Sequence, residues 1–126
     1  AEVTGEIMSN EMRYYSFYNS EPNKPIQIEL RTVESGWLSY YVSRGKNSRP
    51  SATKNLSFAY SGVYGGKMKL TPELLKNRKY KDARGHYVIG IVQNSFSAND
   101  TVKVPTKYTL KVITNPDDLV YASLGN

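Results

Sequence analysis

The alternation of apolar and polar side chains is the main pattern along this chain, and it predicts β-strands. The clearest case is the segment 26–31, in which Ile26, Ile28 and Leu30 alternate with polar residues. The same period of two recurs in the segments 12–18, 37–42, 56–60 and 107–113. Successive side chains of a strand point to opposite faces, so the segment 26–31 is expected to have one buried face and one wet face.

The segment 85–93 is predicted to be a central strand because both of its faces are apolar. Tyr87, Ile89 and Ile91 share one face, whereas Val88 and Val92 lie on the other. A strand of this kind is usually covered on both sides. Gly90 removes a side chain in the middle of the strand, which indicates a bulge or a close approach by a neighbouring segment.

Turn-forming residues separate these segments, and no long helix or internal repeat is evident. Thr71 as N-cap and Pro72 at the first helical position predict one short helical turn near residues 72–76. The polar, basic segment from Arg44 to Lys54 is expected to be a long exposed loop. Seven or eight short strands at this spacing favour an all-β fold, an antiparallel β-sandwich rather than a barrel because several strands keep a polar face.

The domain organisation follows from where the apolar pattern stops. The chain has 126 residues, enough for one domain with a core of its own. From Asn115-Pro116 onward the alternation is lost, so residues 1–114 are predicted to be the domain and residues 115–126 a C-terminal tail or linker. The chain starts without Met and without a signal-peptide pattern, so we expect a processed mature form or a fragment of a longer protein.

Charge is distributed unevenly along the chain. The net charge is −3 over residues 1–42, +11 over residues 43–113 and −2 over the rest, which together give +6. The densest basic segment surrounds one tyrosine, and its candidate binding residues are Arg78, Lys79, Tyr80, Lys81 and Arg84. Such a surface attracts nucleic acid, sulfated glycan or an acidic neighbouring module, or else it serves ordinary solubility. Nucleic acid is the weaker reading, because no sequence signature of a nucleic-acid-binding fold accompanies the basic segment.

Tyrosine is unusually frequent, with eleven in the chain. Tyr14, Tyr18 and Tyr41 fall on the outward side of the predicted strands and are candidate binding residues. Tyrosine provides a large contact area at low entropic cost, which suits a recognition face for a protein or a glycan. The alternative is that these rings face a second sheet or cover sheet edges.

The inventory for catalysis and metal binding is small. There is no cysteine, and His86 is the only histidine. The sequence contains no G-x-S-x-G nucleophile motif, no H-E-x-x-H and no phosphate-binding loop. The one acidic pair, Asp117-Asp118, lies in the predicted tail. We therefore assign no catalytic or metal-ligating residue and expect a protein that is not an enzyme.

Two N-glycosylation sequons lie in or beside predicted loops, at Asn55 and Asn99. No run of residues approaches the length of a membrane helix, so no membrane span is predicted. The sequons are compatible with a glycosylated protein that is secreted or held at the cell surface.

The order of several segments resembles the bacterial pre-peptidase C-terminal domain. The similar segments are Tyr14-Tyr15-Ser16-Phe17, Trp37 to Val42, Gly85 to Ile91 and Tyr108 to Val112, and the likeness spans roughly residues 5–114. It implies a jelly-roll-like β-sandwich in secreted or surface multidomain proteins, often beside a peptidase and without catalysis of its own. The collagen-binding domains of clostridial collagenases are similar, and there exposed aromatic residues contact the ligand.

The chain also departs from that family. Ser39 stands where the family usually carries an acidic residue, and the segment 55–80 is longer and more basic. The resemblance implies calcium as a cofactor of the relatives, but Glu2, Glu6 and Glu11 are too scattered to map its ligands. From the residues themselves no cofactor is expected.

Taken together, these patterns predict a non-catalytic binding module that holds a protein or glycan partner, or neighbouring domains, through an aromatic and basic face. One alternative is a structural subunit of an extracellular assembly, in which the same face is buried against other chains. Another is a protein that binds polyanions.

Overall fold

The computed structural model describes residues 2–9, 11–34, 36–62, 65–93 and 105–113, together with the backbone of residues 120–125. Within these ranges there are nine strands and one short helix. In chain order they are β1 (Glu2–Ile7), β2 (Met12–Asn19), β3 (Ile26–Thr32), β4 (Leu38–Arg44), β5 (Ser57–Ser61), β6 (Gly66–Leu70), α1 (Pro72–Asn77), β7 (Gly85–Gln93), β8 (Thr106–Ile113) and β9 (Val120–Gly125).

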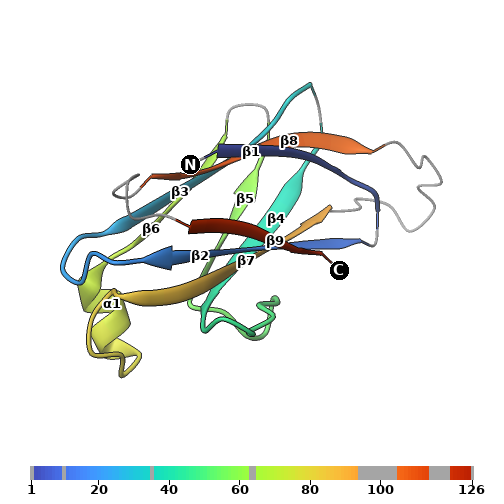
Figure 1. Ribbon diagram of the computed structural model, residues 1–126. Coiled ribbons are helices and arrows are strands. Elements are labelled where there is room, and N and C mark those ends of the chain that lie inside the picture. The colour runs from blue at the N-terminus through green and yellow to red at the C-terminus, as the bar shows by residue number, and fades with distance from the viewer. Residues whose placement is uncertain are drawn as a thin grey trace.

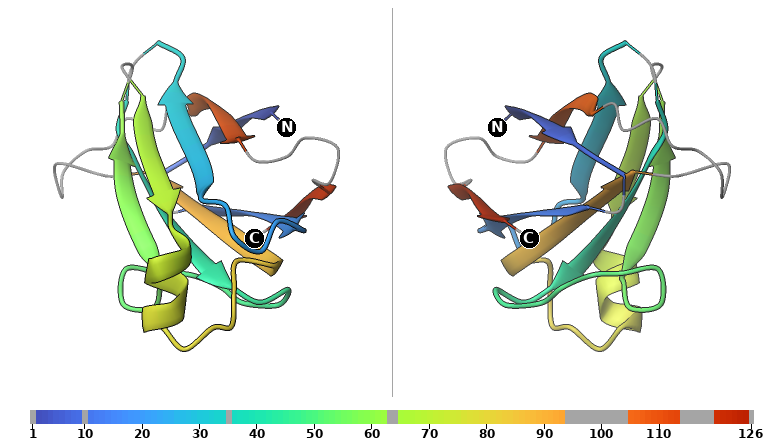
Figure 2. Two further views of the ribbon diagram at one scale, coloured as in Figure 1. Left: turned by 90° about the vertical axis from the view of Figure 1, so that its left-hand side faces the viewer. Right: turned by 90° about the vertical axis from the view of Figure 1, so that its right-hand side faces the viewer.

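The strands form two antiparallel sheets packed face to face (Figure 1). The four-stranded sheet has the order β1-β8-β3-β6 and the five-stranded sheet the order β5-β4-β7-β2-β9. Strands β1 to β8 thus follow the two-sheet order of a jelly roll, and β9 extends one edge. Figure 2 shows the edge strands β1 and β9 on the same side of the sandwich. The predicted antiparallel β-sandwich is confirmed.

Strands β1 and β9 were not predicted, and in each case there is a physical reason. In β1 the inward-facing residues are Val3, Gly5 and Ile7. Because glycine has no apolar side chain, the sequence does not show a regular alternation of apolar and polar residues here. A Cβ at Gly5 would lie 2.5 Å from the Tyr108 hydroxyl oxygen, so the position has to be small. Strand β9 pairs with β2, which corrects the prediction of a tail for residues 120–125. That segment follows an Asn-Pro pair, and its partner strand lies about a hundred residues earlier in the chain.

The predicted inward faces of the strands form the core. Tyr40, Tyr87 and Tyr108 are its largest fully buried side chains. Aliphatic residues of both sheets surround them, among them Ile26, Ile28, Leu30, Leu38, Val42, Ile89, Ile91, Leu110 and Val112. Burial raises the pKa of all three tyrosines, that of Tyr87 to about 12, because the charged phenolate is poorly solvated in the interior.

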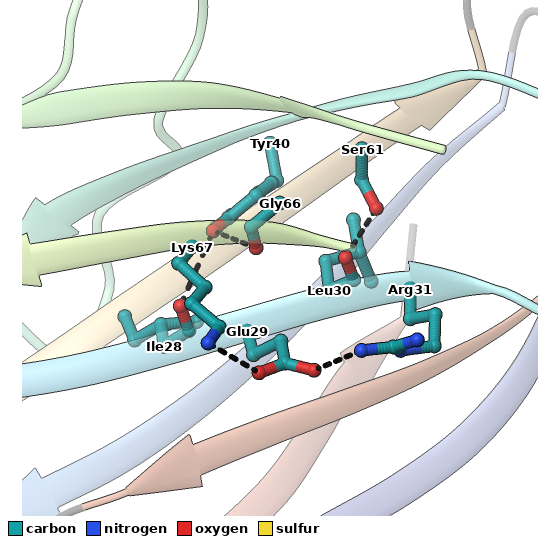
Figure 3. A network of polar contacts seen from close by, with 8 residues as sticks. All are labelled: Ile28, Glu29, Leu30, Arg31, Tyr40, Ser61, Gly66 and Lys67. Carbon is teal, nitrogen blue, oxygen red and sulfur yellow. Dashed lines mark hydrogen bonds and ion pairs between the residues drawn. The ribbon is translucent and has the colours of Figure 1, made fainter. Parts of the chain in front are cut away.

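Hydroxyl groups join the two sheets through the core. The Tyr40 hydroxyl of β4 donates to the carbonyl oxygen of Gly66 at 2.8 Å, across the gap between the sheets (Figure 3). Ser61 of β5 likewise donates to the carbonyl oxygen of Leu30. Tyr15 and Tyr108 share a hydrogen bond of 2.5 Å between their hydroxyls. Each of these bonds satisfies a buried polar atom and fixes one sheet relative to the other.

The outer face of β7 is covered in the middle, as its apolar character predicted. A Cβ built on Gly90 would lie 3.2 Å from the carbonyl oxygen of Pro50 and 3.2 Å from Cε1 of Tyr14. The close approach expected at Gly90 is therefore observed. Pro50 is buried, so the segment from Arg44 to Lys54 is not a fully exposed loop; part of it lies against the sheet. Val88, on the same outer face, is also fully buried.

Candidate binding site

The outer face of the five-stranded sheet carries a row of aromatic residues. The strand registers place Phe58 opposite Tyr41, Tyr41 opposite Gly90, and Gly90 opposite Tyr14. One pair further along, Tyr60 lies opposite Ser39. This row crosses four neighbouring strands, because side chains at paired positions point to the same side of a sheet.

Three aromatic side chains at the β4–β5 edge are largely exposed, and we call Trp37, Phe58 and Tyr60 the aromatic patch. Their exposed fractions are 53%, 56% and 62%. The Phe58 and Tyr60 rings meet edge to face, with centroids 6.2 Å apart. Trp37 lies over Gly62, whose Cβ would be 3.2 Å from the indole ring. Several large aromatic side chains exposed side by side are typical of interaction surfaces.

The amphipathicity of β5 is reversed relative to the other strands. Its large apolar side chains face solvent, whereas Ala59 and Ser61 turn toward the interior. Packing within this domain therefore gains little from Phe58 and Tyr60. The exposed aromatic side of β5 is therefore a candidate binding surface.

The outward tyrosines named from the sequence are half-buried rather than exposed. The guanidinium of Arg49 lies 5.1 Å from the Tyr14 ring centroid, so the β4–β5 loop shields this ring. Tyr18 contacts His86 edge to face, with centroids 4.9 Å apart. Tyr41 borders Phe58 of the aromatic patch across the strand pair. Of the three, Tyr41 is the one that lies directly beside the exposed aromatics.

The basic segment after α1 is held by a helix-terminating turn. The N–H of Tyr80 donates to the carbonyl of Leu75, and that of Lys79 to the carbonyl of Lys76, which is the Schellman pattern. Lys79 adopts φ 69°, a left-handed conformation that favours glycine. Arg78, Lys79, Lys81 and Arg84 are exposed, whereas Tyr80 is half-buried against the core.

Arg44, at the end of β4, fixes this segment to the sheet. Its guanidinium donates to the carbonyl oxygen of Asp82 at 2.8 Å and to that of Arg84. It also lies 4.9 Å from the Tyr80 ring centroid and 5.2 Å from that of Tyr87. The positive charge opposes the effect of burial on the pKa of Tyr87. Arg44 is thus a positioned cation, held by two carbonyls and two rings.

A pocket of about 310 Å³ lies beside Arg44, and we call it the basic pocket. Its cationic residues are Arg44, Lys54 and Arg78, from three separate segments. Ser43, Ser48 and Asn55 add polar groups, and Tyr80 and Leu56 complete the wall. Leu56 precedes β5 directly, so the basic pocket adjoins the start of β5, whereas Tyr60 and Trp37 of the aromatic patch lie toward the other end of the β4–β5 pair.

The remaining candidates from the sequence are His86, the sequon residues Asn55 and Asn99, and the acidic pair Asp117-Asp118. His86 is exposed, and within the described ranges no group of three or more His, Asp or Glu side chains is positioned to hold a metal ion. The side-chain nitrogen of Asn55, the atom that a glycan would modify, donates to the carbonyls of Ser51 and Ala52. Asn99 and the pair Asp117-Asp118 lie outside the described residues. In the part of the chain that is described, no helix is both long and apolar enough to cross a membrane.

Sequence reasoning missed the aromatic patch and Arg44 as site residues. The alternation in the segment 56–60 identified the strand, but which side faces out depends on its register with β4. The one signal in the sequence was the difference in side-chain size between the two faces of this strand, since Ala59 is much smaller than Phe58 and Tyr60. For Arg44 no local signal exists, because Gly85 and Tyr80, which surround it, are far away in sequence.

Comparisons with known proteins agree with this architecture. The chain is similar to the crystal structure of the pre-peptidase C-terminal domain of collagenase from Bacillus anthracis, with a TM-score of 0.58 and 11% sequence identity. The match covers 90% of this chain and 88% of that domain. The chain has the pre-peptidase C-terminal fold. No family model and no curated protein matches the sequence. At this identity the likeness is one of fold, and it confirms the fold that the strand motifs implied.

Proposed function

We propose that this chain is a non-catalytic accessory module of a multidomain protein, secreted or displayed at a cell surface, that holds a protein or glycan partner. The observation that carries the proposal is the aromatic patch, in which two rings of β5, whose inward side chains are small, and Trp37 just before β4 are largely exposed to solvent. The shared fold with a pre-peptidase C-terminal domain of a collagenase supports the accessory role.

The patch has the chemistry of a recognition surface. Tyr60 carries a hydroxyl at the end of an apolar ring, and the rings of Tyr60 and Trp37 are wide and largely exposed. Aromatic residues of this kind dominate the binding energy of many interfaces. Tyr41 extends the surface across β4. A fibrous protein or a polysaccharide, whose surface repeats, is the partner class that we propose for this aromatic surface.

Sedimentation with insoluble ligands tests the proposal. The chain is mixed with fibrillar collagen, and separately with an insoluble polysaccharide such as chitin, and the bound fraction is measured. The double variant Phe58→Ser with Tyr60→Ser is expected to lose at least 90% of the binding to whichever ligand the natural chain retains. The matched control, Val33→Ser with Ile113→Ser, removes two exposed apolar residues outside the patch, 55% and 42% exposed, and should bind normally.

Retention of binding by the folded Phe58/Tyr60 variant contradicts the proposal. Light scattering separates the main alternative, a structural subunit of an assembly. An accessory module remains monomeric at micromolar concentration, whereas a structural subunit forms oligomers that the Phe58/Tyr60 substitutions dissociate.

A further inference from the structure

The basic pocket contains three cationic residues and no acidic one. Ion pairs among the described residues join Arg13 to Glu11, and Arg31 and Lys67 to Glu29, all outside the pocket. The nearest acidic residue in sequence, Asp82, accepts a hydrogen bond from the N–H of Arg84 in its own loop. The lining of the pocket therefore carries positive charge and no acidic side chain, and the carboxylate of Asp82 in the adjoining loop is the nearby counter-charge.

One of the charges that line the pocket, that of Arg44, is fixed in place. Gly85, with φ 147°, leaves room for Arg44, since a Cβ there would lie 2.6 Å from Nε of the guanidinium. The carbonyls that accept from Arg44 orient it, but a carbonyl does not neutralise a cation. A half-buried cation held this way gives up little conformational entropy when an anion binds, so it is preorganised for an anionic ligand.

The other two cations approach from separate segments. Lys54 comes from the end of the β4–β5 loop and Arg78 from the end of α1, and both are exposed. Arg78 also donates to the carbonyl of Asn55 at 3.3 Å, which ties the two segments together. Three cationic side chains that line one cavity match an oxyanion with several acceptor oxygens.

We infer that the basic pocket binds a sulfate ester group of an acidic polysaccharide. The exposed cations Lys79, Lys81 and Arg84 continue the positive charge beyond the pocket, as a polymer with repeated charges requires. The backbone of Lys79 is in a left-handed conformation, which costs less free energy for glycine than for lysine. A lysine at this position therefore favours a role for its positive charge. The site is distinct from the aromatic patch, and the inference does not depend on the function proposed for the patch.

Single-stranded nucleic acid fits the pocket less well. Binding of that kind relies on free aromatic faces on which successive bases stack. Tyr80 is the one aromatic residue among the residues that line the pocket, and its ring packs against the core and Arg44. No stacking platform is therefore offered, and the ligand is recognised by charge and by oxyanion geometry.

Titration of the whole chain with a heparin oligosaccharide tests the inference. The variant Lys54→Gln with Arg78→Gln is expected to bind about tenfold more weakly or worse at 0.1 M salt, with a salt dependence smaller by about two released ions. The matched control, Lys69→Gln with Lys107→Gln, removes the same charge from the outer face of the four-stranded sheet and should change affinity less than threefold. Circular dichroism verifies that every variant is folded, and Lys54→Gln alone serves if the double variant is not.

The ligand class is tested in parallel with desulfated heparin and a single-stranded DNA of equal length. Both are expected to bind at least tenfold more weakly than heparin. The inference is overturned if heparin does not bind, if the control variant loses as much affinity as the pocket variant, or if desulfated heparin or DNA binds as tightly. Loss of heparin binding with intact sedimentation on the insoluble ligands is the pattern expected of the pocket variant, so the two sites are separable.

Discussion

Replacing Tyr40 with phenylalanine removes one oxygen atom from the centre of the sandwich. The Tyr40 side chain is fully buried, and its hydroxyl donates to the Gly66 carbonyl of the opposite sheet at 2.8 Å. A hydrogen bond of this type contributes about 1 kcal/mol net, and leaving a buried carbonyl without its donor adds about 1 to 3 kcal/mol. The ring itself is kept, so no large cavity forms. We expect the free energy of unfolding to fall by about 2 kcal/mol.

The same loss can be expressed as a melting temperature. A chain of 126 residues has an unfolding entropy of about 0.26 kcal/mol per kelvin, so about 2 kcal/mol lowers Tm by about 8 °C. Urea unfolding followed by circular dichroism measures the change in free energy directly, with an unchanged m-value as the check for two-state behaviour.

The neighbouring Tyr41→Phe variant is the control. Tyr41 is on the same strand but on the outer, half-buried face, so removal of its hydroxyl should change stability by less than about 0.5 kcal/mol. If Tyr40→Phe were as stable as the natural chain, or if Tyr41→Phe were the more damaging change, the hydrogen bond between the sheets would not stabilise the fold as argued here.

Three further predictions concern stability. Burial raises the pKa of three tyrosines in the folded state, Tyr40, Tyr87 and Tyr108, so above pH 10 the unfolded chain loses protons that the folded chain keeps. The free energy of unfolding should therefore fall by up to about 4 kcal/mol per pH unit between pH 10 and 12. Urea titrations at pH 9 and 11 measure this change, and equal stability at both pH values would refute it. Gly66→Ala should destabilise by about 1 to 3 kcal/mol, since its Cβ would overlap the Tyr60 carbonyl oxygen, whereas Lys69→Ala on the same strand should not. Lys79→Gly should be more stable than Lys79→Ala by about 1 kcal/mol in thermal unfolding, because both variants lose the charge but only glycine relieves the left-handed backbone; equal stability would contradict that reading.

The sequence was sufficient to predict the fold class and most of the core. The period of two in residues 26–31 and the two-sided apolar strand 85–93 identify which residues are buried, because alternate side chains of a strand lie on opposite faces and here the apolar faces are the buried ones. The helical turn at Thr71-Pro72 was equally predictable, because capping is a local effect. Gly5 in β1 shows the limit, since a glycine that makes room for Tyr108 looks like a break in the pattern until the partner strand is known.

The candidate sites were less predictable, because they depend on which segments meet. The basic residues 78–84 were visible as a cluster, but the pocket also needs Arg44 and Lys54, and only the fold brings these together. The tyrosines at positions 14 and 41 were expected on an outward face, which the strand registers bear out. Their exposure was not predictable, because it depends on the loop that carries Arg49 and Pro50 across the sheet.

The pairing of β1 with β8 has a consequence for how the chain folds. Residue 2 is the partner of residue 111, and residue 18 the partner of residue 120, so each sheet joins one of the earliest strands to one of the latest. Closing loops of this length costs entropy before any contact compensates for it. Folding is therefore expected in milliseconds to seconds rather than microseconds. During synthesis β1 cannot pair with β8 until residues 106–113 have left the ribosome.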